Sequence, residues 1–171
     1  MDVDAVVSEV RAQVAELADE DMPVSAMCLY HAVLAVEAIR ARGVRAILQA
    51  GTATWKMLSP DLDDGTVENA FGYLWDPAEA VPLARRGLMP EMHVWAATVA
   101  PMAVVDLASC YFPAQAQRLK GIAWRAAPPP DYVWGTPPAG CRYEPHREAV
   151  ACAVAMAARV FGERRALRAV M

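Results

Sequence analysis

The stretch VSAMCLYHAVLAVEAIRARG, residues 24–43, carries the clearest structural signal in the chain. Ser25 is a favourable N-cap residue and Gly43 a natural C-terminal cap, so the pattern predicts a helix between them. Apolar residues lie almost all the way round this helix, which is typical of a helix buried in the middle of a domain. Cys28 is expected in its first turn.

Several β-favouring segments follow this predicted helix. Residues 44–55 (VRAILQAGTATW) and 71–75 (FGYLW) indicate two strands, separated by a polar loop over residues 59–69. Residues 92–99 (MHVWAATV) and 103–107 (AVVDL) indicate two more strands, joined by a tight antiparallel connection. The expected fold is therefore α+β, with a central buried helix packed on a small antiparallel sheet.

The remaining segments flank this core. Apolar residues spaced three and four apart predict an amphipathic helix over residues 2–19, which we expect to pack on the core. Residues 126–140 indicate a proline-rich loop, and residues 145–169 an alanine-rich terminal helix. No internal repeat is evident, so we expect residues 1–171 to form a single domain with its catalytic core over residues 22–112.

The composition bears on location and partners. The chain is 56% hydrophobic and 21% charged with a formal net charge of -4, which favours a globular domain. Because no basic face is evident, we expect neither nucleic acid nor a membrane as partner. Residues 1–13 lack the pattern of a secretory signal, and no segment is long enough to span a bilayer. Four irregularly spaced cysteines favour reduced thiols in the cytoplasm.

Cys28 is the candidate nucleophile. The first turn of a helix stabilises a thiolate through unpaired backbone N–H groups and the positive end of the helix dipole. The other cysteines are expected just after a strand (Cys110), in a loop (Cys141) and inside the terminal helix (Cys152). Small buried cysteines are also common in core helices, so a catalytic role for Cys28 depends on its partners.

His93 and Asp106 are the candidate partners. A thiol nucleophile needs a base within hydrogen-bond reach, and the base needs a third group that fixes its tautomer. We expect His93 to lie directly opposite Asp106 on neighbouring strands, with the turn centred between Val99 and Ala100. An aspartate in so apolar a strand requires a hydrogen-bond partner. The alternative for His93 is a core histidine bonded to a backbone carbonyl.

The order of these residues resembles the transglutaminase-like branch of the papain-like cysteine enzymes. A cysteine at a helix start is followed by the strand GVRAILQAGTATW, then by His93 in MHVWAATV and Asp106 in VVDLAS. The resemblance covers residues 22–112 and implies a papain-like fold in which Cys28, His93 and Asp106 form a catalytic triad. It does not choose between hydrolysis and transfer. The residues VSAM before Cys28 offer no Gln, Trp or Tyr side chain for an oxyanion hole.

The sequence thus predicts a cysteine-dependent acyl-transfer enzyme that hydrolyses or deamidates an amide through a thioester, with no cofactor or metal. The expected substrate is a peptide, a protein or a small amide, and both a monomer and a homodimer stay open. One alternative is a non-catalytic binding module on the same fold. The other is a zinc site using Cys28, His31 and His93. Further candidate cleft residues are His31, Tyr30, Trp55 and Trp95.

Overall fold

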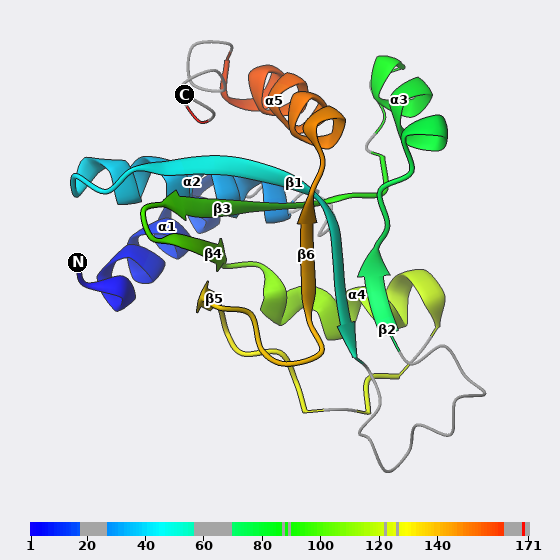
Figure 1. Cartoon of the computed structure of the whole chain (residues 1–171), viewed down its shortest axis with the longest axis horizontal. Coiled ribbons are helices and arrows are strands. Elements are labelled where there is room, and N and C mark those ends of the chain that lie inside the picture. The colour runs from blue at the N-terminus through cyan, green and yellow to red at the C-terminus, as the bar shows by residue number, and fades with distance from the viewer. Residues whose placement is uncertain are drawn as a thin grey trace.

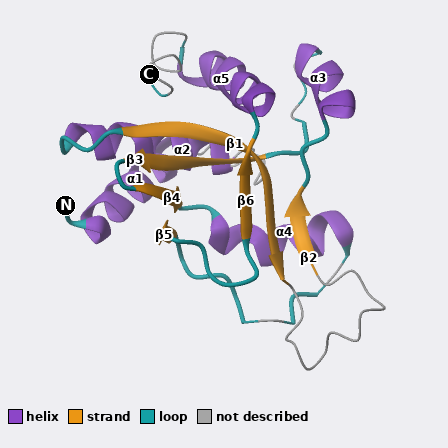
Figure 2. Cartoon of the chain, viewed as in Figure 1, coloured by secondary structure: helices purple, strands orange, loops and turns teal. Residues whose placement is uncertain are grey.

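The structure is a computed structural model and describes residues 1–17, 27–56, 70–86, 88, 90–121, 123–125, 127–162 and 169. In these ranges the chain forms five α-helices and one six-stranded antiparallel sheet (Figure 1, Figure 2). The α+β class is therefore confirmed. The expected N-cap Ser25 and the polar loop over residues 59–69 lie outside the described residues.

Two helices, α1 (Val3–Leu17) and α2 (Met27–Ala41), pack against each other on one side of the sheet. The apolar stripe of α1 is buried, and its buried residues are Val6, Val7, Val10 and Val14. Most residues of α2 are buried, as its apolar sequence predicts. The helix ends just before Gly43, whose φ of 78° suits a glycine C-terminal cap.

The sheet has the strand order β2-β1-β3-β4-β5, and β6 also pairs with β1. The strands are β1 (Ala46–Lys56), β2 (Ala70–Tyr73), β3 (His93–Val99), β4 (Met102–Asp106), β5 (Val133–Gly135) and β6 (Arg142–Pro145). The first half of β1 pairs with β3, and its second half pairs with β2 and β6. This long curved strand therefore organises the whole sheet (Figure 1).

Gly51 marks the point where β1 changes partners. It is paired with His93 of β3 and with Pro145 of β6. A Cβ atom at this position would lie 2.1 Å from the backbone oxygen of Glu144. Only glycine therefore lets β6 approach β1 beside the start of β3.

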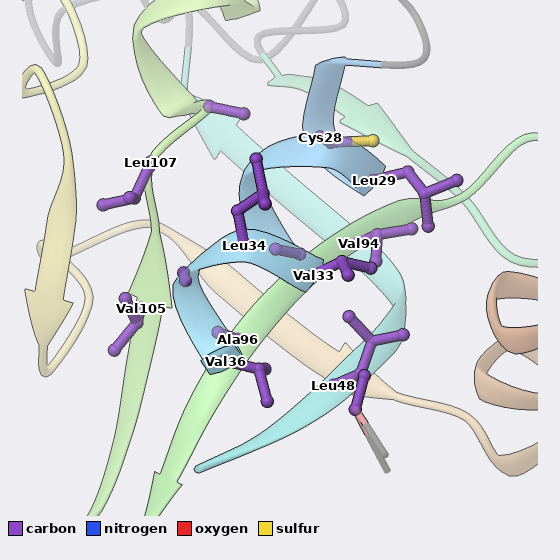
Figure 3. Packing of buried hydrophobic residues seen from close by; sticks show 14 of the residues in the cluster. Cys28, Leu29, Val33, Leu34, Val36, Leu48, Val94, Ala96, Val105 and Leu107 are labelled. Atoms are coloured by element: carbon purple, nitrogen blue, oxygen red, sulfur yellow. The ribbon is translucent and has the colours of Figure 1, made fainter. Parts of the chain in front are cut away.

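Buried side chains form two clusters. The larger one lies between the sheet and the helices, and Figure 3 shows Val33 and Val36 of α2 close to Val94 and Ala96 of β3. The smaller cluster joins the second half of β1 to α4 (Phe112–Lys120), and its buried members are Ala53, Trp55, Phe71, Phe112, Ala116 and Val133. Because side chains alternate along a strand, β3 sends His93 and Trp95 away from Val94 and Ala96.

The region after β4 differs from the prediction. The helix α4 was not predicted, and the expected loop over residues 126–140 contains β5. The expected terminal helix over residues 145–169 is shorter: β6 runs up to Pro145, and α5 (Arg147–Phe161) ends at Gly162 with a φ of 85°. Both strands are held by partners far away in the sequence, so no local periodicity announces them.

The helix α3 (Pro77–Arg85) follows β2, and the Asp76 side chain caps it by accepting a hydrogen bond from the Ala78 backbone N–H. In the part of the chain that the structure describes, no helix combines the length and the apolar character that a bilayer crossing requires.

Candidate functional site

Cys28 and His93 line the same small cavity. Cys28 is the second residue of α2, and His93 is the first residue of β3. Both are buried, with exposed fractions of 6% and 1%. The full lining of the cavity is Met27, Cys28, Tyr73, His93, Ala108, Tyr111, Phe112 and Gln115. The start of the buried helix therefore meets the start of the histidine strand, and Figure 3 shows Cys28 at that end of α2.

His93 and Asp106 are in direct contact. The distance from His93 Nε2 to Asp106 Oδ2 is 2.7 Å, and both side chains are 1% exposed. A hydrogen bond at this distance between a carboxylate and an imidazole fixes the orientation of the ring. The structure thus brings together the three residues that the sequence singled out.

The expected strand register is wrong by a small shift. Ala96 pairs with Val105, so the turn is centred between Ala100 and Pro101, and His93 reaches Asp106 diagonally. Proline has no N–H to give to a strand ladder, and this register leaves Pro101 in the turn. The shift moves the centre of the turn by one residue, so both side chains stay on the same face.

Asp106 is held by more than the histidine. The Tyr143 hydroxyl donates to Oδ2 at 2.6 Å, and the Ala108 backbone N–H donates to Oδ1 at 2.8 Å. Burial by itself would raise the pKa of Asp106, but the His93 charge and these hydrogen bonds outweigh it and lower the pKa below its ordinary value. The carboxylate is therefore kept ionised inside the protein.

His93 is kept protonated by its neighbours. Burial by itself would lower its pKa, but the charge and hydrogen bond of Asp106, followed by those of Cys28, raise the pKa of His93 to about 10. With Nε2 engaged by Asp106, the buried Nδ1 is the ring nitrogen left for Cys28. Nδ1 has no hydrogen bond of standard geometry, and such contacts are often loose in unliganded sites.

Aromatic rings enclose the imidazole of His93. Tyr73 stacks on it at a centroid distance of 5.6 Å and Trp95 at 6.1 Å, while Phe112 meets it edge-on at 4.9 Å. Burial first, and the charge of Cys28 second, raise the pKa of Tyr73. The phenol therefore stays neutral beside the thiol. This enclosure keeps water from the ring and strengthens its contact with Asp106.

Of the further cleft candidates, Trp95 stacks on His93 itself. Trp55 contacts the rings of Phe112 and Tyr143, and His31 contacts the ring of Tyr111. The ring of Tyr30 meets Phe161 of α5 at 5.1 Å. Trp55 belongs to the smaller buried cluster. His31 lies one turn after Cys28, but its Nδ1 is 2.8 Å from the Met27 carbonyl oxygen, and burial lowers its pKa. None of these three lines the cavity.

The geometry gives no support to the zinc alternative. Within the described ranges, no group of three or more His, Cys, Asp or Glu side chains is placed to hold a metal ion. Cys28, His31 and His93 thus do not form a ligand set, although His31 and Cys28 share one helix.

Two residues of the site were missed in the sequence. Tyr143 comes from β6, most of which lies between the expected proline-rich loop and the expected terminal helix, and Gln115 comes from α4, and neither element was predicted. The Gln115 side chain is 1% exposed and lines the cavity. The only available signal was chemical, because a buried carboxylate such as Asp106 needs additional donors.

Comparison with known proteins identifies no relative. No protein-family model, no curated protein and no solved structure matches the chain. The likeness to transglutaminase-like enzymes therefore remains a hypothesis that rests on the order of Cys28, His93 and Asp106 in the sequence.

Proposed function

We propose that this protein is a cysteine-dependent acyl-transfer enzyme of the transglutaminase-like, papain-like kind, with Cys28 as nucleophile. One observation carries the proposal. Cys28 and His93 are buried and line a common cavity, and Asp106 holds the far side of the imidazole at 2.7 Å. A thiol, a base and an orienting carboxylate are the parts that nucleophilic catalysis by cysteine requires.

The charges of these groups support the proposed reaction. A protonated His93 stabilises the Cys28 thiolate, which attacks the carbonyl carbon of an amide and forms a C–S bond. His93 then gives its proton to the leaving amine, and a thioester remains on Cys28. Water, deprotonated by His93, attacks the thioester, releases the acid and restores the thiol. Asp106 holds the ring in place during both steps.

The proposed substrate class is a peptide, a protein or a small amide. Hydrolysis or deamidation is favoured over transfer to an amine, because water needs no second binding site. All four cysteines are free thiols. A reducing compartment such as the cytoplasm therefore suits the proposed chemistry.

Thiol labelling at pH 7 tests the proposal. Methyl methanethiosulfonate should modify Cys28 first, because burial raises the pKa of Cys110, of Cys152 and of Cys141, the last to about 11. His93→Ala should slow the labelling of Cys28 at least tenfold through loss of the ion pair. The measurement is peptide mapping by mass spectrometry over time. Equal labelling rates in wild type and His93→Ala would remove His93 from its proposed role.

Ester hydrolysis gives the matching readout of catalysis. Wild-type protein should release p-nitrophenolate from p-nitrophenyl acetate, and Cys28→Ala should reduce the release to background. Asp106→Asn should slow it by about 10²–10⁴-fold, since the ring loses its orienting charge. Cys110→Ala is the matched control and should match wild type. Unchanged release by Cys28→Ala would show that the cavity only binds ligands.

A further inference from the structure

Attack of a thiolate on a carbonyl carbon places a negative charge on the carbonyl oxygen. Enzymes stabilise this oxyanion with hydrogen-bond donors that are already in position, in a site that excludes water. The four residues before Cys28 include no Gln, Trp or Tyr side chain. Backbone N–H groups at the start of the helix can contribute, and a further side-chain donor of these types has to come from another part of the chain.

Gln115 is a side-chain donor that lies at the cavity of Cys28 and His93. It is a residue of α4, and it lines the same cavity as Cys28 and His93. Its neighbours Phe112 and Ala116 are 1% and 0% exposed and anchor the helix in the smaller buried cluster. Phe112 also contacts the His93 ring, at a centroid distance of 4.9 Å. Gln115 is therefore held on a rigid element that is packed against the catalytic base.

The amide of Gln115 has a defined orientation. Its Oε1 accepts a hydrogen bond from the Arg118 guanidinium at 3.1 Å. A guanidinium only donates, so the atom facing it is the amide oxygen, and the other end of the amide is the NH₂ group. The Gln115 Nε2 is buried and has no hydrogen-bond partner. The Gln115 NH₂ group is thus a buried hydrogen-bond donor that has no acceptor.

Unpaired buried donors are unusual, and the Gln115 amide is one that lies at this cavity. In the described part of the chain, such side-chain nitrogens occur at Trp55, Trp75, His93 and Gln115. His93 and Gln115 both line the cavity with Cys28, whereas the two tryptophans do not. Leaving a buried donor unpaired costs free energy, so an acceptor that arrives with a ligand would satisfy it.

We infer that Gln115 is a catalytic residue whose Nε2–H donates a hydrogen bond to the oxyanion formed when Cys28 attacks a carbonyl group. The inference rests on the proposed acyl-transfer function and adds a donor to it. With p-nitrophenyl acetate, the Cys28 sulfur forms a bond to the acetyl carbon and the C=O electron pair moves to the oxygen. Collapse of this intermediate expels p-nitrophenolate and leaves acetyl-Cys28.

Two probes separate this role from a general effect on the thiol. Acylation by p-nitrophenyl acetate passes through an oxyanion, whereas methyl methanethiosulfonate carries no carbonyl and reacts at sulfur. Gln115→Met keeps the length of the side chain and removes the donor. We expect acylation of Cys28 to slow by about 10²–10³-fold, with unchanged labelling by the thiosulfonate. Gln117→Met, an exposed glutamine of the same helix, is the matched control and should behave as wild type.

The outcomes are distinct. If wild type and Gln115→Met are acylated at Cys28 at equal rates, the inference fails and the proposed function stands. If both probes slow together in Gln115→Met, the residue only shapes the cavity, and the inference is again wrong. If wild type is not acylated at Cys28, the proposed function itself fails. The melting temperature of Gln115→Met should stay close to that of wild type, because the variant removes an unpaired buried donor together with the hydrogen bond from Arg118.

Discussion

For the single residues, the main feature of the site is a pair of charged side chains, His93 and Asp106, that are buried away from solvent. Asp106 is kept ionised by hydrogen bonds from His93, Tyr143 and Ala108, and the ionised Asp106 in turn keeps His93 protonated. The charge state of each of the two side chains therefore depends on that of the other. Removing one of them should change the protonation of its neighbour more than its position.

This dependence predicts the titration of the two buried histidines. The His93 ring should stay protonated through neutral pH and titrate near pH 10, whereas His31 should titrate below its ordinary value of 6.5. Asp106→Asn should lower the pKa of His93 more than Cys28→Ala does, because Asp106 is the stronger cause of the shift. NMR of ¹⁵N-labelled imidazoles measures both values. A His93 that titrates near 6.5 in wild type would contradict the arrangement.

Among the helices and strands, those with a strong local sequence pattern were predicted, whereas a strand held only by long-range pairing was not. The helix carrying Cys28 and the strand carrying His93 have strong local patterns, and the structure contains both. β6 has only four residues and ends in Pro145, and it exists because β1 pairs with it. Such a strand carries no pattern of its own in the sequence.

The same distinction explains how much of the candidate site could be predicted. Cys28, His93 and Asp106 belong to elements with clear local patterns, so their types and order were enough to suggest a triad. Tyr143 and Gln115 belong to elements that were missed. The diagonal contact of His93 with Asp106 depends on where the turn is centred, and short apolar strands leave that choice open.

Gly51 provides a prediction at this scale. Gly51→Ala places a Cβ atom against the Glu144 carbonyl, and the backbone cannot yield without separating β6 from β1. We expect a loss of about 3 kcal/mol in the free energy of unfolding, measured by urea denaturation. Gly43→Ala is the control: Gly43 has a φ of 78° and open space around it, so only about 1 kcal/mol should be lost. Equal losses of unfolding free energy in Gly51→Ala and Gly43→Ala would contradict the proposed clash between a Cβ at position 51 and the Glu144 carbonyl.

At the scale of the whole molecule, the first helix and the proline-rich segment are joined. The Tyr132 hydroxyl donates to Asp4 at 2.8 Å, and Arg11 donates to the Asp131 carbonyl oxygen at the same distance. α1 also packs on α2 through its buried valines. These contacts tie α1 to the segment before β5, and we expect wild type to unfold in one cooperative transition.

The charge pair should also shape the stability of the molecule against pH. The pKa of His93 is raised in the folded state, so its contribution is complete below about pH 6.5 and is lost as the pH rises towards 10. The pKa of Asp106 is lowered, so its contribution is present above about pH 3.8 and is lost as the pH falls through the folded value.

Wild type should therefore exceed Asp106→Asn in melting temperature most clearly between about pH 4 and 6.5. The difference should shrink on both sides of this window, and differential scanning calorimetry across the range measures it. Tyr143→Phe, which keeps the charge pair and removes one hydrogen bond, should show the same profile with a smaller amplitude. A difference that is constant with pH would mean that the pair is not ionised in the folded protein.

The pairing of β6 with β1 also has a consequence for synthesis on the ribosome. Cys28 emerges from the ribosome well before Tyr143. The strand β1 is also synthesised before β6, so this pairing cannot form until the intervening chain has been made. During that interval Asp106 lacks the hydrogen bond from the Tyr143 hydroxyl. We therefore expect the full set of hydrogen bonds to Asp106 to form only after β6 has been synthesised and has paired with β1.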